Sequence, residues 1–338
     1  MNTSGTHPQS PPACPDDDVP VLPAHVMLTE VVMRDGLQIE PRILPTDTKV
    51  ALLDRISELG FPRIEVTSFV SAKAVPALAD AEEVFARIRR RPGVRYTALA
   101  MTPRGAARAL AAGVDEISVV VSASEAHNRA NVGRDIAESF AGFAEIAAVL
   151  GERASGEHPV GLSGAISMSF GCPLEGEIPA SRVFDLIERY LAMGVYDIGL
   201  ADTTGMGYPT QVAALCRAAR RRYPEARFGL HLHDTRGLGL ANALAGLQAG
   251  IDRLDACIGG LGGCPFAPGA SGNVSTEDLL HMLDAMGVST GVDLDGVLGL
   301  RTQLAEAVGH TLEGHVGVAG PRRRPAACDA VAQAPGRV

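Results

Sequence analysis

Residues 26–60 read VMLTEVVMRDGLQIEPRILPTDTKVALLDRISELG and contain one complete strand–helix unit. The apolar run at 26–32 is typical of a buried β-strand. Between 46 and 59 the apolar residues recur at helical spacing on one face, and Gly60 is well placed to end that helix. The stretch therefore predicts a strand, a polar loop and a helix in succession.

The same alternation continues along the chain. Further strands are predicted at 63–68, 94–100, 116–121, 160–168, 196–200, 227–232 and 253–258, and further helices at 75–90, 103–112, 135–150, 179–193, 209–223, 238–249 and 276–286. Strands that alternate with helices pair in parallel through right-handed crossovers. Eight such units over about 260 residues favour an α/β fold, a closed TIM (β/α)8 barrel, over an open doubly wound sheet. Another helical pattern at 294–308 predicts additional C-terminal helices.

The composition predicts one folded domain with tails. Apolar residues make up 46% of the 338 residues and charged residues 20%, which is typical of a globular protein. The segment 1–24 is rich in Pro, Ser and Asp and is expected to be disordered. We expect the barrel and its helical extension to span 25–316, followed by a flexible tail at 317–338.

Several classes of protein are disfavoured. The net charge of −9 lacks the basic footprint of a nucleic-acid binder. Gly and Pro interrupt the charge-free stretch 256–276, so no membrane span is expected. The six cysteines show no C-x-x-C spacing, and the N-terminus resembles no secretory or mitochondrial leader, so a reducing cytoplasmic location is expected. Dinucleotide, P-loop and α/β-hydrolase motifs are not found in the sequence.

In such barrels the active site lies at the carboxyl ends of the strands. Arg34 and Asp35 follow the first predicted strand, where the carboxylate can bind a hard cation and the guanidinium can stabilise an oxyanion. A surface turn with a local ion pair is the competing interpretation. Glu65 lies within the apolar second strand, where a charge needs a partner. It could orient Arg34 across the barrel mouth or form a structural salt bridge.

His231 and His233 end the seventh predicted strand. Residues two apart on a strand face the same side, so both imidazoles can bind one metal ion, which we favour over two unrelated histidines. The glycine-rich loop after strand eight carries Cys264, a thiol that could transfer protons or remain passive. Asn273 could offer an amide oxygen to the metal or cap the next helix. Asp202, after strand six, could contact substrate or cap a turn.

These motifs together closely resemble the hydroxymethylglutaryl-CoA lyase family, within the wider group of metal-dependent lyase and synthase barrels. The resemblance covers roughly 25–315. The matching segments are R-D-G-L-Q-I-E at 34–40, I-E-V-T-S-F-V at 64–70, H-L-H-D-T at 231–235, G-L-G-G-C-P-F-A at 260–267 and G-A-S-G-N at 269–273. The loop that contains Cys264 is the most specific of them and points to the lyase branch.

The resemblance implies a role for each matching residue. It assigns the metal ligands to Asp35, His231, His233 and Asn273, and ligands of this kind suit Mg2+ or Mn2+. It also implies catalytic roles for Arg34, which stabilises the enolate, for its supporting carboxylate Glu65, for Cys264, and for Asp202 and His231 in the same site. The implied reaction is the retro-Claisen cleavage of 3-hydroxy-3-methylglutaryl-CoA to acetyl-CoA and acetoacetate in leucine breakdown. A homodimer that acts on this small-molecule acyl-CoA is the corresponding expectation.

Several residues beside the implied site depart from the usual pattern of the family. Val32 and Met33 replace a Gly-Pro pair, Ile39 replaces an Asn, and Arg236 follows the histidine motif where a Tyr is usual. These substitutions raise the hypothesis of a related 3-hydroxy-3-alkylglutaryl-CoA as substrate. A Claisen-type synthase or aldolase of the same superfamily and a catalytically silent barrel are the two competing hypotheses.

Overall fold

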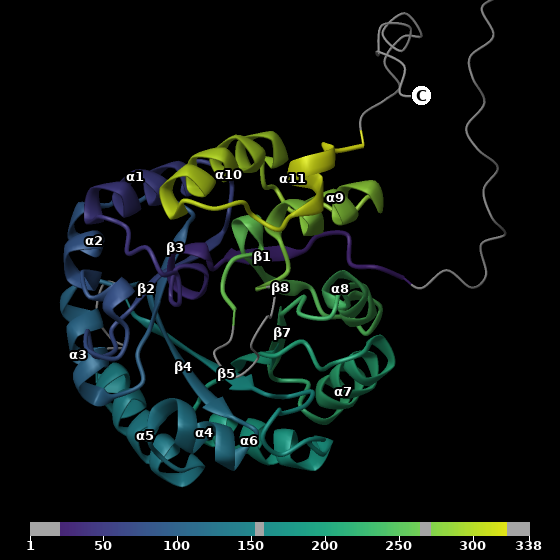
Figure 1. Ribbon diagram of the computed structural model, residues 1–338. Helices are drawn as coiled ribbons and strands as arrows, with labels where there is room; N and C mark the ends of the chain where they lie inside the picture. Colours follow the sequence, from purple (N-terminus) through teal and green to yellow (C-terminus); the bar gives the residue numbers. More distant parts are fainter. Residues whose placement is uncertain (1–20, 153–158, 264–271, 323–338) are drawn as a thin grey trace, which may run out of the picture.

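The computed structural model describes residues 21–152, 159–263 and 272–322, and within them eight parallel strands form a closed barrel (Figure 1). Each strand pairs with the next, and the last closes on the first. The strands are β1 Met27–Glu30, β2 Arg63–Ser68, β3 Arg95–Leu99, β4 Glu116–Ser122, β5 Gly161–Ser167, β6 Asp197–Asp202, β7 Arg227–Leu232 and β8 Arg253–Ala256. The predicted TIM (β/α)8 fold is therefore confirmed.

Helices surround the barrel on the outside (Figure 1). They are α1 Thr46–Ile56, α2 Ala81–Arg87, α3 Pro103–Ala111, α4 Glu125–Val132, α5 Ile136–Glu152, α6 Ala180–Ala192, α7 Pro209–Arg222, α8 Gly239–Gln248, α9 Thr276–Ala285, α10 Leu294–Val308 and α11 His315–Ala319. Three short turns complete the order: the π-helical η1 Val32–Gly36 and the 3-10 turns η2 Pro76–Leu78 and η3 Ile258–Gly260. None of the described helices is long and apolar enough to cross a membrane.

The turn after α1 depends on Gly60, although α1 itself ends at Ile56 with Ser57 as its C-cap, earlier than the predicted end at residue 59. Gly60 has a φ of 91°, a backbone conformation that residues other than glycine rarely adopt. A Cβ at this position would lie 2.2 Å from the carbonyl oxygen of Gly291, so glycine is also required by packing. The chain can therefore reverse here and enter β2.

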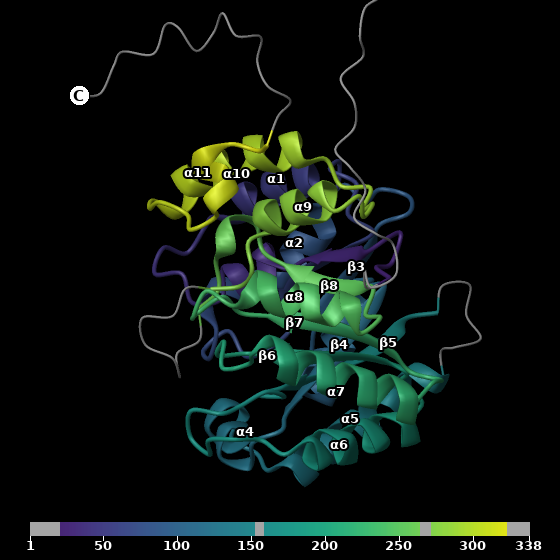
Figure 2. The ribbon, with the colours of Figure 1, turned by 90° about the vertical axis from the view of Figure 1, so that its right-hand side faces the viewer.

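The C-terminal helices extend one side of the barrel. α10 packs against α1 and α9, and α11 packs against α9. Figure 2 shows these three C-terminal helices together at one end of the molecule, opposite α4, α5 and α6. α11 continues to Ala319, so helical structure extends past residue 316, where the tail was expected to begin. The disordered segment expected at 1–24 lies mostly outside the described residues.

Two helical segments differ from the predictions. The single helix predicted at 75–90 is broken into η2 and α2 at Asp80, whose carboxylate accepts hydrogen bonds from Lys49 and Thr46 and makes no capping hydrogen bond to α2. The short α4 was missed because its polar sequence has no apolar periodicity. Its start is fixed instead by Ser124, whose hydroxyl accepts a hydrogen bond from the backbone N–H of His127.

Candidate active site and metal centre

The turn η1 holds Arg34 and Asp35 at the mouth of the barrel. The carbonyl of Val31 accepts hydrogen bonds from the backbone N–H groups of Arg34, Asp35 and Gly36, at 3.1, 2.8 and 3.2 Å. π-Helical turns are rare and are frequently found at functional sites. The consecutive side chains of Arg34 and Asp35 thereby both line the cavity inside the barrel.

Arg34 lies between two carboxylates. Its Nε donates to Oε2 of Glu65 at 2.7 Å, and its Nη1 donates to Oδ1 of Asp35 at 2.5 Å. Burial alone would lower the pKa of Arg34, but Glu65 and Asp35 raise it above its ordinary value. Burial raises the pKa of Glu65, against the opposing effect of Arg34. The predicted contact between Glu65 and Arg34 is thus present, and Nη2 is the guanidinium nitrogen outside these two ion pairs.

Asp35, His231 and His233 form a compact cluster. The Nε2 atoms of the two histidines lie 3.2 Å apart, and Oδ2 of Asp35 lies 3.8 Å from His231 and 3.6 Å from His233. Burial alone would raise the pKa of Asp35, but Arg34 and the imidazoles hold it well below its ordinary value. The structure therefore brings together an ionised carboxylate and two imidazole nitrogens from opposite parts of the sequence.

Asn273 completes the cluster from the segment before α9. Its Nδ2 donates to Oδ2 of Asp35 at 2.6 Å and to the carbonyl of Leu261 at 2.9 Å. Asn273 does not cap α9, because the Ser275 hydroxyl accepts the backbone N–H of Asp278. The capping alternative for Asn273 is therefore excluded, and its side chain belongs to the cluster.

The cluster fits a divalent cation. The nitrogen and oxygen atoms of Asp35, His231 and His233 lie within 4.8 Å of one another. Among the atoms described, Oδ1 of Asn273 is buried without a hydrogen-bond partner, which is costly in a folded protein. A carboxylate, an amide and two imidazoles without a thiolate suit a hard cation such as Mg2+ or Mn2+.

Asp255 supports His231 and was not predicted from the sequence. Its Oδ2 lies 3.3 Å from Nδ1 of His231. A carboxylate in this place favours a proton on Nδ1 and directs Nε2 toward the cluster, as is common for histidine ligands. Burial alone would raise the pKa of Asp255, but His231 lowers it. The sequence carried the same signal for Asp255 as for Glu65, because each is an acidic residue inside a short apolar strand.

Asp202 is placed differently from the other predicted residues. It is 1% exposed, and its carboxylate accepts hydrogen bonds from the backbone N–H groups of Met206 and Gly207, at 2.8 and 3.0 Å. Its side chain does not line the cavity. The geometry supports the turn-capping alternative for Asp202.

The glycine-rich loop passes directly against Asp35. Gly262 has a φ of 93°, and a Cβ at this position would lie 2.7 Å from the backbone oxygen of Asp35. Glycine therefore allows the loop to approach the metal cluster. Cys264, the predicted catalytic thiol, lies two residues further on and outside the described residues.

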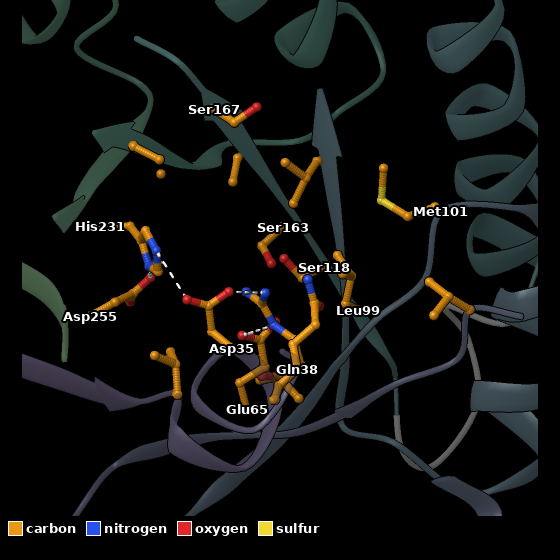
Figure 3. A pocket seen from close by; sticks show the side chains of 18 of the residues that line it. Asp35, Gln38, Glu65, Leu99, Met101, Ser118, Ser163, Ser167, His231 and Asp255 are labelled. Carbon is orange, nitrogen blue, oxygen red and sulfur yellow. Dashed lines mark hydrogen bonds and ion pairs between the residues drawn. The ribbon is translucent and has the colours of Figure 1, made fainter. Parts of the chain in front are cut away.

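The site opens into a cavity of about 780 Å3 that is lined by residues of all eight strands, some of which Figure 3 shows. Among the described residues, its wall includes Arg34, Asp35, Glu65, His231 and His233. Figure 3 shows Asp35 between His231 on one side and Ser118 and Ser163 on the other. The chemical groups of the cluster are therefore exposed to a space that can hold a small organic molecule.

Comparisons with known proteins agree with this arrangement. The family model described as HMGL-like matches residues 25–303. The cytoplasmic 3-hydroxy-3-methylglutaryl-CoA lyase of Mus musculus is 42% identical over 299 residues, which are 88% of this chain and 85% of the relative. The (R)-citramalyl-CoA lyase of Chloroflexus aurantiacus is also 42% identical, over 88% of this chain and 95% of the relative.

A solved structure provides the same assignment. An HMG-CoA lyase from Acinetobacter baumannii, in complex with coenzyme A and 3-methylmalate, has a TM-score of 0.84 and 45% sequence identity to this chain. The match covers 90% of this chain and 98% of the other. The fold, the cluster at the barrel mouth and these relatives agree: the chain belongs to the HMGL-like family.

Proposed function

We propose that this protein is a lyase that cleaves 3-hydroxy-3-methylglutaryl-CoA to acetyl-CoA and acetoacetate with the aid of Mg2+ or Mn2+. The observation that carries the proposal is the placement of Arg34, fixed by Glu65, beside the cluster of Asp35, His231 and His233. The names of the relatives support the same acyl group. Both relatives compared by sequence carry lyase names, which favours cleavage over the synthase alternative.

Asp35, His231, His233 and Asn273 would hold the cation. When bound, such an ion polarises substrate oxygens and favours loss of the hydroxyl proton. In the proposed reaction a base removes the proton of the C3 hydroxyl, a C3=O double bond forms, and the C2–C3 bond breaks. Its electron pair passes to C2 and the thioester oxygen as the enolate of acetyl-CoA, and an acid then protonates C2.

The residues of the chain have distinct roles in this scheme. Arg34 can donate from Nη2 to the oxygen on which the negative charge develops, while Glu65 keeps the guanidinium plane fixed. Asp255 orients the His231 ring. Cys264 and a histidine are the candidates for the two proton transfers, by resemblance to the family.

The experiment that tests the function is product analysis. With purified protein, Mg2+ and 3-hydroxy-3-methylglutaryl-CoA, we expect acetyl-CoA and acetoacetate in equal amounts. Condensation of acetyl-CoA with a 2-oxo acid, without cleavage, would instead support the synthase. From the resemblance and the cytoplasmic relative we further propose a homodimer in the cytoplasm, which sedimentation and cell fractionation can test.

A further inference from the structure

Three small residues lie side by side on the inner wall of the barrel. Ala165 of β5 is in register with Gly199 of β6, which is in register with Gly229 of β7. All three line the cavity. Barrel interiors are usually filled by bulky branched side chains, so this part of the wall leaves the barrel hollow.

The fold itself does not require these two glycines. Neither Gly199 nor Gly229 has a positive φ. A Cβ at Gly199 would meet its nearest atom, Cβ of Ala165, at 3.5 Å, and a Cβ at Gly229 would meet the carbonyl oxygen of Arg253 at 3.4 Å. These are ordinary contacts, and glycine inside a strand weakens it. Neither backbone conformation nor packing against the described residues accounts for these glycines, and the space they leave is open to a ligand.

The hollow begins at the catalytic groups and continues below them. Gly229 precedes His231 by two residues on the same strand, a rise of about 6.6 Å, which is the reach of roughly five heavy atoms in an extended chain. Residues of both levels line one continuous cavity. A substituent on the reacting carbon of a bound substrate can therefore extend into the hollow.

Part of the wall beside this hollow is polar, whereas Val120, in register with Ala165, is apolar. Ser118 and Ser163 are in register on β4 and β5, and both line the cavity (Figure 3). Arg63 donates from Nη2 to the Ser163 hydroxyl at 3.0 Å, and its Nε is buried without a partner among the atoms described. A plain alkyl chain would remove these groups from water without replacing their hydrogen bonds, which is unfavourable.

The floor of the hollow is neutral overall. Arg63 is ion-paired with Glu116, and Arg253 is ion-paired with Asp197 at 2.5 Å. An additional charge would be buried without a counter-ion there. An uncharged group that both donates and accepts hydrogen bonds fits the floor best, and a hydroxyl is the simplest such group.

We propose that the hollow is a subsite for the C3 substituent, and that the preferred substrate carries there a chain of about five heavy atoms ending in a hydroxyl group instead of a methyl group. The proposal rests on the proposed function, since it assumes the same cleavage and the same acetyl-CoA product. It differs only in the 3-oxo acid that is released.

The test compares three substrates by the rate of acetyl-CoA release. They are the 3-methyl compound, its 3-pentyl homologue and the 3-(4-hydroxybutyl) homologue, which has the same length as pentyl. We expect kcat/KM for hydroxybutyl to be at least about tenfold above that for pentyl, since a site with buried polar groups rejects an analogue that leaves them unpaired. We also expect kcat/KM for the hydroxybutyl substrate to equal or exceed kcat/KM for the methyl substrate.

Variants locate the effect in the hollow. Gly199→Val should lower kcat/KM for the hydroxybutyl substrate at least about tenfold more than for the methyl substrate, because its side chain occupies the subsite. Gly199→Ala, the matched control, should have a much smaller effect. Ser118→Ala should reduce the preference for hydroxybutyl over pentyl.

The outcomes separate this inference from the function on which it rests. If the wild type had a higher kcat/KM for the methyl substrate than for the hydroxybutyl substrate, the proposed size of the subsite would be wrong. If it preferred the pentyl substrate to the hydroxybutyl substrate, the proposed polar end of the subsite would be wrong. Absence of cleavage for all three compounds, with Mg2+ bound, would overturn the proposed function and this inference with it.

Discussion

The Nε2 atoms of His231 and His233 lie 3.2 Å apart, and both face Oδ2 of Asp35. Two imidazole nitrogens at this distance must share a proton or direct their lone pairs at a common cation. Oδ1 of Asn273, which is buried and has no hydrogen-bond partner in the part of the chain that the structure describes, lies on a fourth side chain of the same cluster. This arrangement is the basis for the predictions on metal binding.

Replacing His233 should abolish tight metal binding. His233→Ala removes one of the two imidazoles, and we expect Mn2+ affinity, measured by titration calorimetry, to fall by more than roughly a hundredfold, because loss of an outer partner alone costs about ten- to a hundredfold. His281→Ala on α9, outside the cluster, is the control and should bind as the wild type does. Equal affinity in both variants would contradict the assignment.

Asp255 should influence the metal without touching it. Asp255→Asn removes the carboxylate that fixes Nδ1 of His231 at 3.3 Å, so metal affinity should drop roughly tenfold to a hundredfold. Asp252→Asn, on the exposed residue just before β8, should leave the affinity unchanged. The role of Asp255 would be disproved if Asp255→Asn bound Mn2+ as tightly as Asp252→Asn does.

Glu65 should affect turnover rather than metal binding. Glu65→Gln keeps the shape of the side chain but removes the charge that holds Nε of Arg34 at 2.7 Å. We expect kcat to fall by about a hundredfold, the cost of a misplaced catalytic group. Mn2+ affinity should change little, because Glu65 contacts Arg34 and is outside the cation cluster. A variant that loses metal but keeps kcat at saturating Mn2+ would reverse the assignment.

The barrel was predictable because its pattern is repeated. Most strands are short apolar runs and most helices are amphipathic, so the alternation of strands and helices can be recognised even where a single element is predicted wrongly. The contact between Glu65 and Arg34 was predictable for a similar reason, since charges in apolar strands need partners. The π-helical turn at Val32–Gly36 was not predictable, because it depends on one carbonyl that accepts three N–H groups.

The placement of Asp202 shows that a sequence motif does not determine which way a side chain points. Along β6 the residues that line the cavity are Asp197, Gly199 and Ala201, with a period of two. Asp202 is out of phase with them and points away from the cavity, toward the N–H groups of its own loop. The period could have favoured the turn-capping alternative for Asp202 and indicated Asp255, which follows the cavity-lining Arg253 by two positions on β8.

A buried carboxyl should make stability depend on pH. Glu30 is 0% exposed, and burial raises its pKa from 4.5 to about 8. Between these values the unfolded chain is ionised at Glu30 while the folded chain is protonated, so the unfolding free energy contributed by this residue falls as pH rises, and the loss is complete above about 8.

Glu30→Gln tests this effect. Oε1 of Glu30 accepts two backbone N–H groups and Oε2 contacts the Thr276 hydroxyl, an arrangement that a glutamine can reproduce. In urea unfolding, stability of the variant relative to wild type should rise between pH 5 and 8, by at most about 1.4 kcal/mol per pH unit. Glu145→Gln, on an exposed position of α5, should show no such trend. A pH-independent difference for Glu30→Gln would refute the prediction.

The central claim is that the cluster at the barrel mouth cleaves a 3-hydroxyacyl-CoA with the help of a divalent cation. The most direct measurement is acetyl-CoA release from 3-hydroxy-3-methylglutaryl-CoA with Mg2+, with EDTA, and after Mg2+ is restored, for the wild type and Arg34→Met. We expect turnover that EDTA abolishes and Mg2+ restores, and that falls by at least about a hundredfold in Arg34→Met. Turnover that persists in EDTA, or wild-type protein with bound Mg2+ that releases no acetyl-CoA, would contradict the account.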